Sequence, residues 1–83
     1  MSRVAVMFLY VGSSRAFRSL SGGVLRYVVR SNNLAMGIAI ARDELWKDLD
    51  VRDGRLGRLA KECGVTRIDF RPVEAAKVAV DCD

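Results

Sequence analysis

Histidine is absent from this chain of 83 residues, and only two cysteines are present, Cys63 and Cys82. Without histidine there is no Ser-His or Cys-His pair for nucleophilic catalysis. Two thiols are too few for a structural zinc site, and they do not form a CxxC redox pair. Their redox state is open between one disulfide and two thiols, and we expect reduced thiols in a cytoplasmic protein. The composition thus predicts a protein without metal or cofactor that is not an enzyme.

Acidic residues are missing from the first 42 positions, which contain six arginines. These are Arg3, Arg15, Arg18, Arg26, Arg30 and Arg42. From Asp43 onward there are eight basic and ten acidic residues, and the whole chain has a formal net charge of +4. Genomic base composition is one explanation for so much arginine, but it explains the missing acids less well. The asymmetry therefore indicates an anionic partner for the N-terminal half.

Long apolar runs are also lacking, and the longest, residues 4–11, is too short to cross a membrane. With 51% hydrophobic and 29% charged residues, the chain suits one small domain spanning residues 1–83. Residues 3–11 are apolar at every position but Arg3, which is typical of a strand buried on both faces. We expect this strand in the centre of a sheet, and no membrane partner.

Residues 24–41 show a period of two that predicts two strands joined by a tight turn at residues 31–33. The Asn32-Asn33 pair suits such a turn because asparagine tolerates left-handed backbone. In the second expected strand, bulky residues alternate with small ones. The small ones are Ala35, Gly37, Ala39 and Ala41.

Two helices are expected. A short one lies within residues 12–23, capped by Ser13 or Ser14, with Phe17 and Leu20 on its buried side. The main one spans residues 51–63 and ends at Gly64. A strand at residues 65–71 follows and ends at Pro72, and residues 74–80 are open between helix and a final edge strand. The predicted fold is α+β, an antiparallel sheet of four to five strands packed against one main helix, with the short helical segment after the first strand.

Several short patterns suggest specific functions. Residues 59–66 resemble the first helix and turn of a DNA-binding helix-turn-helix, but Pro72 would interrupt the second helix. Residues 48–54 lack the oxygen ligands of a calcium loop. Residues 12–15, Gly-Ser-Ser-Arg, could present backbone amides to a phosphate. An arginine-rich ribonuclease of toxin type would use Tyr10, Tyr27, Arg26 and Arg30.

Residues 37–46 read Gly-Ile-Ala-Ile-Ala-Arg-Asp-Glu-Leu-Trp, and this stretch is similar to one in a phage anti-CRISPR protein. The resemblance implies a small inhibitor that docks on a nucleoprotein complex. The similar protein is acidic and mimics DNA, whereas this chain is basic, so that mechanism does not transfer.

The sequence predicts a non-enzymatic binding protein whose basic half engages an anionic macromolecule. Its partner-binding residues are expected to be Arg15, Arg18, Arg26 and Arg30. The partner is an acidic protein surface, a ribonucleoprotein or a nucleic acid. Because the small-residue strip at residues 35–41 would leave an apolar face uncovered, we also expect a homodimer, or a fold completed by its partner.

Overall fold

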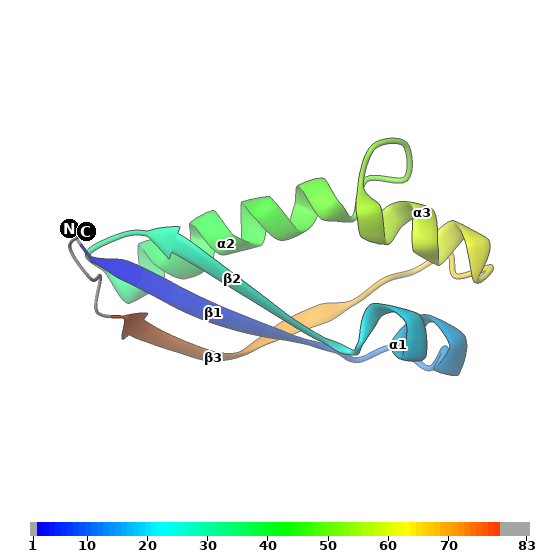
Figure 1. Ribbon diagram of the computed structural model, residues 1–83, viewed down its shortest axis with the longest axis horizontal. Helices are drawn as coiled ribbons and strands as arrows, with labels where there is room; N and C mark the ends of the chain where they lie inside the picture. The colour runs from blue at the N-terminus through cyan, green and yellow to red at the C-terminus, as the bar shows by residue number, and fades with distance from the viewer. Residues whose placement is uncertain (1, 79–83) are drawn as a thin grey trace.

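A three-stranded antiparallel sheet and three helices make up residues 2–78, which are the residues that the computed structural model describes. The elements follow the order β1 (Arg3–Tyr10), α1 (Arg15–Ser21), β2 (Val24–Arg30), α2 (Leu34–Asp48), α3 (Arg55–Glu62) and β3 (Phe70–Val78). Helix α2 runs along the sheet, and α1 and α3 lie together at one end (Figure 1). The α+β class and the antiparallel sheet are confirmed. The described part of the sheet has three strands rather than four or five, and α2 is longer than the helix expected to dominate.

Strand β1 is the central strand, as its sequence predicts, because the strand order is β2-β1-β3. Its even-numbered side chains point toward α2, and Val4, Val6 and Phe8 are fully buried there. Its odd-numbered side chains point to the other face of the sheet and are half-buried or exposed. Figure 1 shows no helix over that second face. Only one of the two apolar faces of β1 is therefore covered within residues 2–78.

The predicted second strand at residues 34–41 is wrong, since this segment opens α2. Asn33 is the N-cap of the helix, and its side chain accepts a hydrogen bond from the Met36 amide at 3.2 Å. The buried helical residues, Gly37, Ala41 and Leu45, are four apart. A spacing of four satisfies both a strand's period of two and one face of a helix, so the alternation was ambiguous. The asparagine that suits a turn served as a helix cap instead.

Gly37 allows α2 to lie close to β1. A Cβ atom added at Gly37 would lie 2.6 Å from the Cβ of Val4, which is closer than two carbon atoms can pack. The expected strip of small residues is therefore not one exposed surface. Gly37 and Ala41 are buried against the sheet, whereas Ala35 and Ala39 lie on the exposed side of the helix.

Helix α3 begins at Arg55, four residues later than predicted, and its N-cap is Gly54. The Asp50 carboxylate instead accepts hydrogen bonds from the amides of Arg52 and Asp53, at 2.8 and 3.2 Å. These two bonds favour the charged carboxylate and lower the pKa of Asp50. Asp50 thus shapes the loop between α2 and α3.

Gly64 ends α3 as predicted, with a left-handed φ of 68°. The amides of Gly64 and Val65 bond back to the carbonyls of Lys61 and Ala60, which is the Schellman arrangement. Residues 65–69 then contain no helix and lead into β3. The helix-turn-helix interpretation of this segment is therefore wrong.

Strand β3 starts later than expected and continues through Pro72. Met7 pairs with Glu74 and Phe8 with Pro72, so Val73 forms a bulge. Proline is tolerated because β3 is an edge strand and the missing N–H would point away from β1. The strand expected at residues 65–71 is wrong over residues 65–69, whereas residues 70 and 71 belong to β3. Of the two structures left open for residues 74–80, the edge strand is present as far as Val78. Residues 79 and 80 of that prediction lie outside the described residues.

An aromatic cluster closes the end of the core where α1 meets the sheet. The ring of Tyr10 lies 4.9 Å from that of Phe17 and 5.5 Å from that of Phe70, measured between centroids. Ser14 caps α1, as predicted, by accepting a hydrogen bond from the Phe17 amide at 3.1 Å. Leu20, which we expected on the buried side of α1, is 63% exposed.

Candidate functional site

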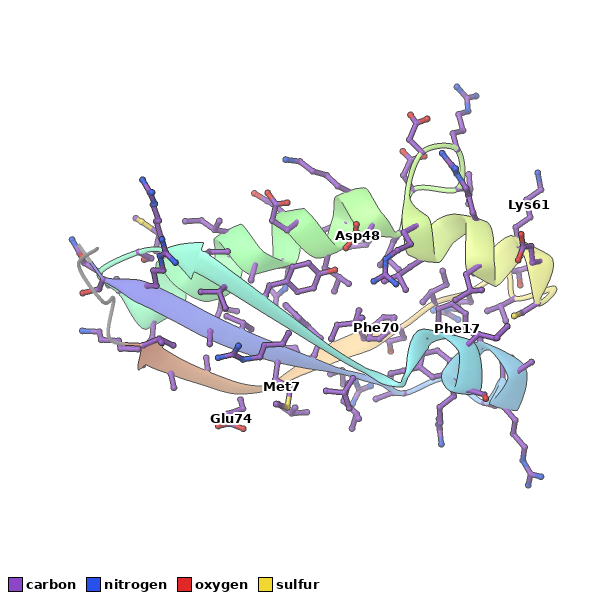
Figure 2. All side chains as sticks on the ribbon, viewed as in Figure 1. Met7, Phe17, Asp48, Lys61, Phe70 and Glu74 are labelled. Atoms are coloured by element: carbon purple, nitrogen blue, oxygen red, sulfur yellow. The ribbon has the colours of Figure 1, made fainter. Side chains whose placement is uncertain are left out.

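The face of the sheet opposite α2, here called the open face, collects the exposed side chains of all three strands. In an antiparallel sheet, residues paired across neighbouring strands share a face, so the register defines this surface. Figure 2 shows two of its members, Met7 and Glu74, pointing away from α2. The open face consists of Arg3, Ala5, Met7 and Leu9 in β1, Val24, Arg26, Val28 and Arg30 in β2, and Arg71, Glu74, Ala76 and Val78 in β3.

Arg3 and Arg30 are direct cross-strand partners on this face. The Ser31 amide donates to the Ser2 carbonyl at 3.1 Å, so the next pair along, Arg3 with Arg30, is of the non-hydrogen-bonded kind. Side chains of such pairs approach most closely, with Cβ atoms about 4.5–5.5 Å apart. Two cations therefore stand side by side at one end of the open face, and Arg26 lies on the same face of β2.

No acidic side chain within residues 2–78 forms a salt bridge with Arg3, Arg26 or Arg30. The described ion pairs join Lys47 to Glu44 on α2, and Arg71, the fourth arginine of the open face, to Asp69. Glu74 is the one acid on the open face, and Met7 separates it from Arg26 in the same cross-strand row. These three residues help to line a shallow hollow of about 130 Å³. Arg3, Arg26 and Arg30, the open-face arginines without a described ion pair, are thus solvated cations.

Apolar side chains lie beside these cations, with Val28 in the row between Arg30 and Arg26, and Leu9 and Val24 in the row beyond Arg26. Leu9, Val24 and Val28 are 41%, 47% and 44% exposed, respectively. No aromatic side chain lies on the open face, because Tyr10 and Tyr27 point to the side that α2 covers. The face therefore combines aliphatic surface with positive charge, and it has no ring on which a base could stack.

Two of the four predicted binding residues, Arg26 and Arg30, lie together on the open face. Arg15 and Arg18 lie on α1, beyond the far end of β2. The Arg18 guanidinium donates to the Gly12 carbonyl at 2.8 Å and lies 5.6 Å from the centroid of the Tyr10 ring. The Arg18 side chain therefore contacts the fold while it remains exposed at the surface.

Arg3 was not among the predicted binding residues, although it belongs to the same cluster. Its position has the same parity as Ala5, Met7 and Leu9, which placed it on one face of the first strand. What the sequence did not provide was the register, which sets Arg3 beside Arg30.

The four residues of the ribonuclease hypothesis do not come together. Tyr27 faces α2, where its hydroxyl donates a hydrogen bond to the Asp48 carboxylate at the end of that helix. Burial, then this hydrogen bond and the charge of Asp48, raise the pKa of Tyr27 well above its ordinary value, although Arg55 opposes the shift. Arg26 and Arg30 lie on the opposite face of β2. Tyr27 is thus a neutral phenol that links β2 to α2.

The backbone amides after β1, considered above for phosphate binding, are partly engaged within the fold. The Ser14 amide donates to the Tyr10 hydroxyl at 3.3 Å, and the Phe17 amide donates to the Ser14 hydroxyl. Among the described residues there is also no group of three or more acids and cysteines that could hold a metal ion.

A second apolar surface lies between α2, α3 and residues 64–68, where a hollow of about 470 Å³ opens to solvent. Trp46 and Val51 at its rim are each 65% exposed, and Leu49, Val65 and Ile68 contribute to its walls. Figure 2 shows Lys61, which also lines the hollow, pointing out from α3. This hollow is on the side of the molecule away from the open face.

Searches against protein-family models, curated proteins and solved structures find no match to this chain. No helix within residues 2–78 combines the length and the apolar character that crossing a bilayer requires.

Proposed function

We propose that the chain is a non-enzymatic binding protein that docks through its open face on an acidic surface of a partner protein. The observation that carries this proposal is the cross-strand pair of Arg3 and Arg30, on the same face as Arg26. Like charges directly opposite each other on a sheet destabilise it. A partner that supplies carboxylates at this place removes the repulsion, and the fold gains stability when it binds.

The apolar part of the open face favours a protein over a nucleic acid. Leu9, Val24 and Val28 offer aliphatic surface that a phosphate backbone cannot cover, whereas a protein surface with both acidic and apolar side chains fits all of it. Single-stranded nucleic acids are bound on sheets through stacking on aromatic rings, and this face has none. Direct binding of DNA or RNA is the alternative, and it is an outcome of the test below.

An inhibitor that docks on a nucleoprotein complex, as the resemblance to phage anti-CRISPR proteins implies, would use such a surface on a protein subunit. Arg15 and Arg18 on α1 are beyond the open face, so a contribution from them requires a partner that also reaches this end of the molecule. Arg3, Arg26 and Arg30 are therefore the centre of the proposal.

We also propose that the partner, rather than a second copy of the chain, covers the open face. A second copy would bring four more arginines to a face whose described cations already exceed its described acids. Light scattering of the free protein should give a mass near 9.2 kDa at micromolar concentration. A mass near twice that value would revive the homodimer.

The experiment is a pull-down from a lysate of the cells that contain the chain, with and without nuclease treatment. A protein that stays bound after nuclease treatment, and then binds in purified form, supports the proposal. If binding is lost with nuclease, and the pure chain binds naked DNA or RNA with an affinity that falls steeply with salt, the nucleic-acid alternative is correct.

A further inference from the structure

The outer edge of β2 has a row of backbone groups with no partner in residues 2–78. The Tyr10 amide donates to the Gly23 carbonyl and the Ser31 amide to the Ser2 carbonyl, so the odd-numbered residues of β2 bond to β1. The even-numbered residues then direct their N–H and C=O groups away from the sheet. These residues are Val24, Arg26, Val28 and Arg30, and no described hydrogen bond reaches their outer groups.

The other edge of the sheet is protected. On β3, Pro72 has no N–H, and the bulge at Val73 interrupts the ladder. Strand β2 contains neither a proline nor a bulge along its seven residues. Of the two described sheet edges, β2 is therefore the one with which an added strand can pair without interruption.

The side chains of β2 determine which strand would fit. Residues of an added strand that pair with Arg26 and Arg30 would share the open face with these guanidinium groups, so acidic side chains suit those positions. Residues that pair with Leu25, Tyr27 and Val29 would lie on the α2 side, beside the margin of the core, so apolar side chains suit them. The matching strand has two acids four residues apart, with apolar residues at the two positions that pair with Tyr27 and Val29.

We propose that β2 binds an extended segment of the partner, in which acidic and apolar residues alternate, as a fourth strand of the sheet. This inference rests on the proposed function and adds the mode of binding to it. A second copy of β2 fits poorly, because an antiparallel pair centred on Tyr27 sets Arg26 diagonally beside the Arg26 of the other copy. An acidic strand meets the same edge with opposite charge.

The test uses synthetic peptides with the core Glu-Val-Thr-Val-Glu and the full chain, in a fluorescence titration. One peptide is N-methylated at the Glu and Thr residues, whose N–H groups would point to β2. The matched control is N-methylated at the two Val residues, whose N–H groups would point away. We expect the first peptide to bind about tenfold more weakly or worse than the parent, because ladder hydrogen bonds are lost, and the control to bind like the parent.

A protein variant tests the same edge from the other side. Val28→Pro removes one outward N–H and is compatible with an edge strand, whereas Val28→Thr keeps that N–H. Because the Val28 side chain lies on the open face, Val28→Thr measures the effect of changing that side chain alone. We expect Val28→Pro to lose clearly more affinity than Val28→Thr, with circular dichroism showing that both variants fold. If Val28→Pro does not fold, the comparison of the two N-methylated peptides alone tests strand addition.

Equal binding of both N-methylated peptides would overturn strand addition, while salt-sensitive binding of the acidic peptides would leave the proposed function standing. No binding of the parent peptide would also overturn this inference. Failure of the proposed function itself would appear separately, as loss of the partner protein on nuclease treatment.

Discussion

Arg3 and Arg30 lie directly opposite each other on β1 and β2, with both side chains on the open face. Replacing one of them should stabilise the free protein while weakening its binding. For Arg30→Gln we expect the free energy of unfolding to rise by about 0.2–1 kcal/mol, because the repulsion across the strand pair is removed. Urea unfolding at low salt measures this gain, which should shrink at high salt because ions screen the two charges.

The control for that prediction is Arg30→Lys, which keeps the charge and should leave stability nearly unchanged. A loss of stability in Arg30→Gln would show that the two guanidinium groups do not repel each other in the folded state. It would remove the main support for a binding role of this pair.

Arg18 should stabilise the fold through its side-chain contacts, not only through its charge. Arg18→Gln removes the hydrogen bond to the Gly12 carbonyl and the contact with the Tyr10 ring, and we expect a loss of about 1 kcal/mol. Arg15→Gln, on the same helix, removes the same charge, and no described hydrogen bond or ion pair of the Arg15 side chain is lost. Thermal unfolding compares the two variants, and equal melting temperatures would contradict a structural role for Arg18.

Tyr27 should make the protein less stable at alkaline pH. Its pKa in the folded state is raised by burial and by Asp48, whereas in the unfolded state tyrosine ionises near pH ~10. The contribution of neutral Tyr27 to the free energy of unfolding is therefore complete below about pH 10. It is lost as the pH rises above that value, because Tyr27 releases its proton in the unfolded state first.

Tyr27→Phe provides the comparison, since it lacks this ionisation and the hydrogen bond to Asp48. At neutral pH we expect it to be about 1 kcal/mol less stable than the wild type. The difference should narrow as urea midpoints are measured from pH 8 to pH 11. A constant difference over this range would contradict the raised pKa.

Gly37→Ala should destabilise the protein, although alanine normally favours a helix by about 1 kcal/mol over glycine. The added Cβ would lie 2.6 Å from the Val4 Cβ, and overpacking of this kind costs about 1–3 kcal/mol. The Val4→Ala variant keeps the Val4 Cβ but removes the two Cγ atoms, which would lie 2.7 and 2.8 Å from the added Cβ, so the overpacking is partly relieved. In a double-mutant cycle, the cost of Gly37→Ala should therefore be smaller in the Val4→Ala background, and strict additivity would contradict the close contact.

The parts of the fold that sequence analysis predicted well depend on local signals. The strand at residues 3–10 follows from apolar residues on both faces, the start of α1 from Ser14, and the end of α3 from Gly64. In each case the residue type and its immediate neighbours determine the structure. The sequence-based predictions agree with the structure where a local sequence pattern is compatible with only one local structure.

The second strand of the expected hairpin was predicted wrongly because its sequence pattern is compatible with both a strand and a helix. Residues 34–41 alternate in size, but Asn33, a good helix cap, and the buried spacing of Gly37, Ala41 and Leu45 fit a helix equally well. Packing of Gly37 on Val4 decides between them, and that contact depends on tertiary structure. For the candidate site, the alternation of side chains along a strand was enough to place Arg26 and Arg30 on one face. Placing Arg3 beside Arg30 also required the register between β1 and β2, which the sequence does not provide.

The most direct measurement compares two triple variants of equal net charge in binding to the purified partner protein. One is Arg3→Gln/Arg26→Gln/Arg30→Gln on the open face, and the other is Arg42→Gln/Arg52→Gln/Arg67→Gln, whose positions lie on α2 and in the loops beside α3. If the open face is the docking surface, calorimetry should show that the first variant loses at least about tenfold in affinity, while the second binds like the wild type. Equal losses in the two variants would mean that only overall charge matters, and an unchanged affinity of the first variant would place the binding surface elsewhere.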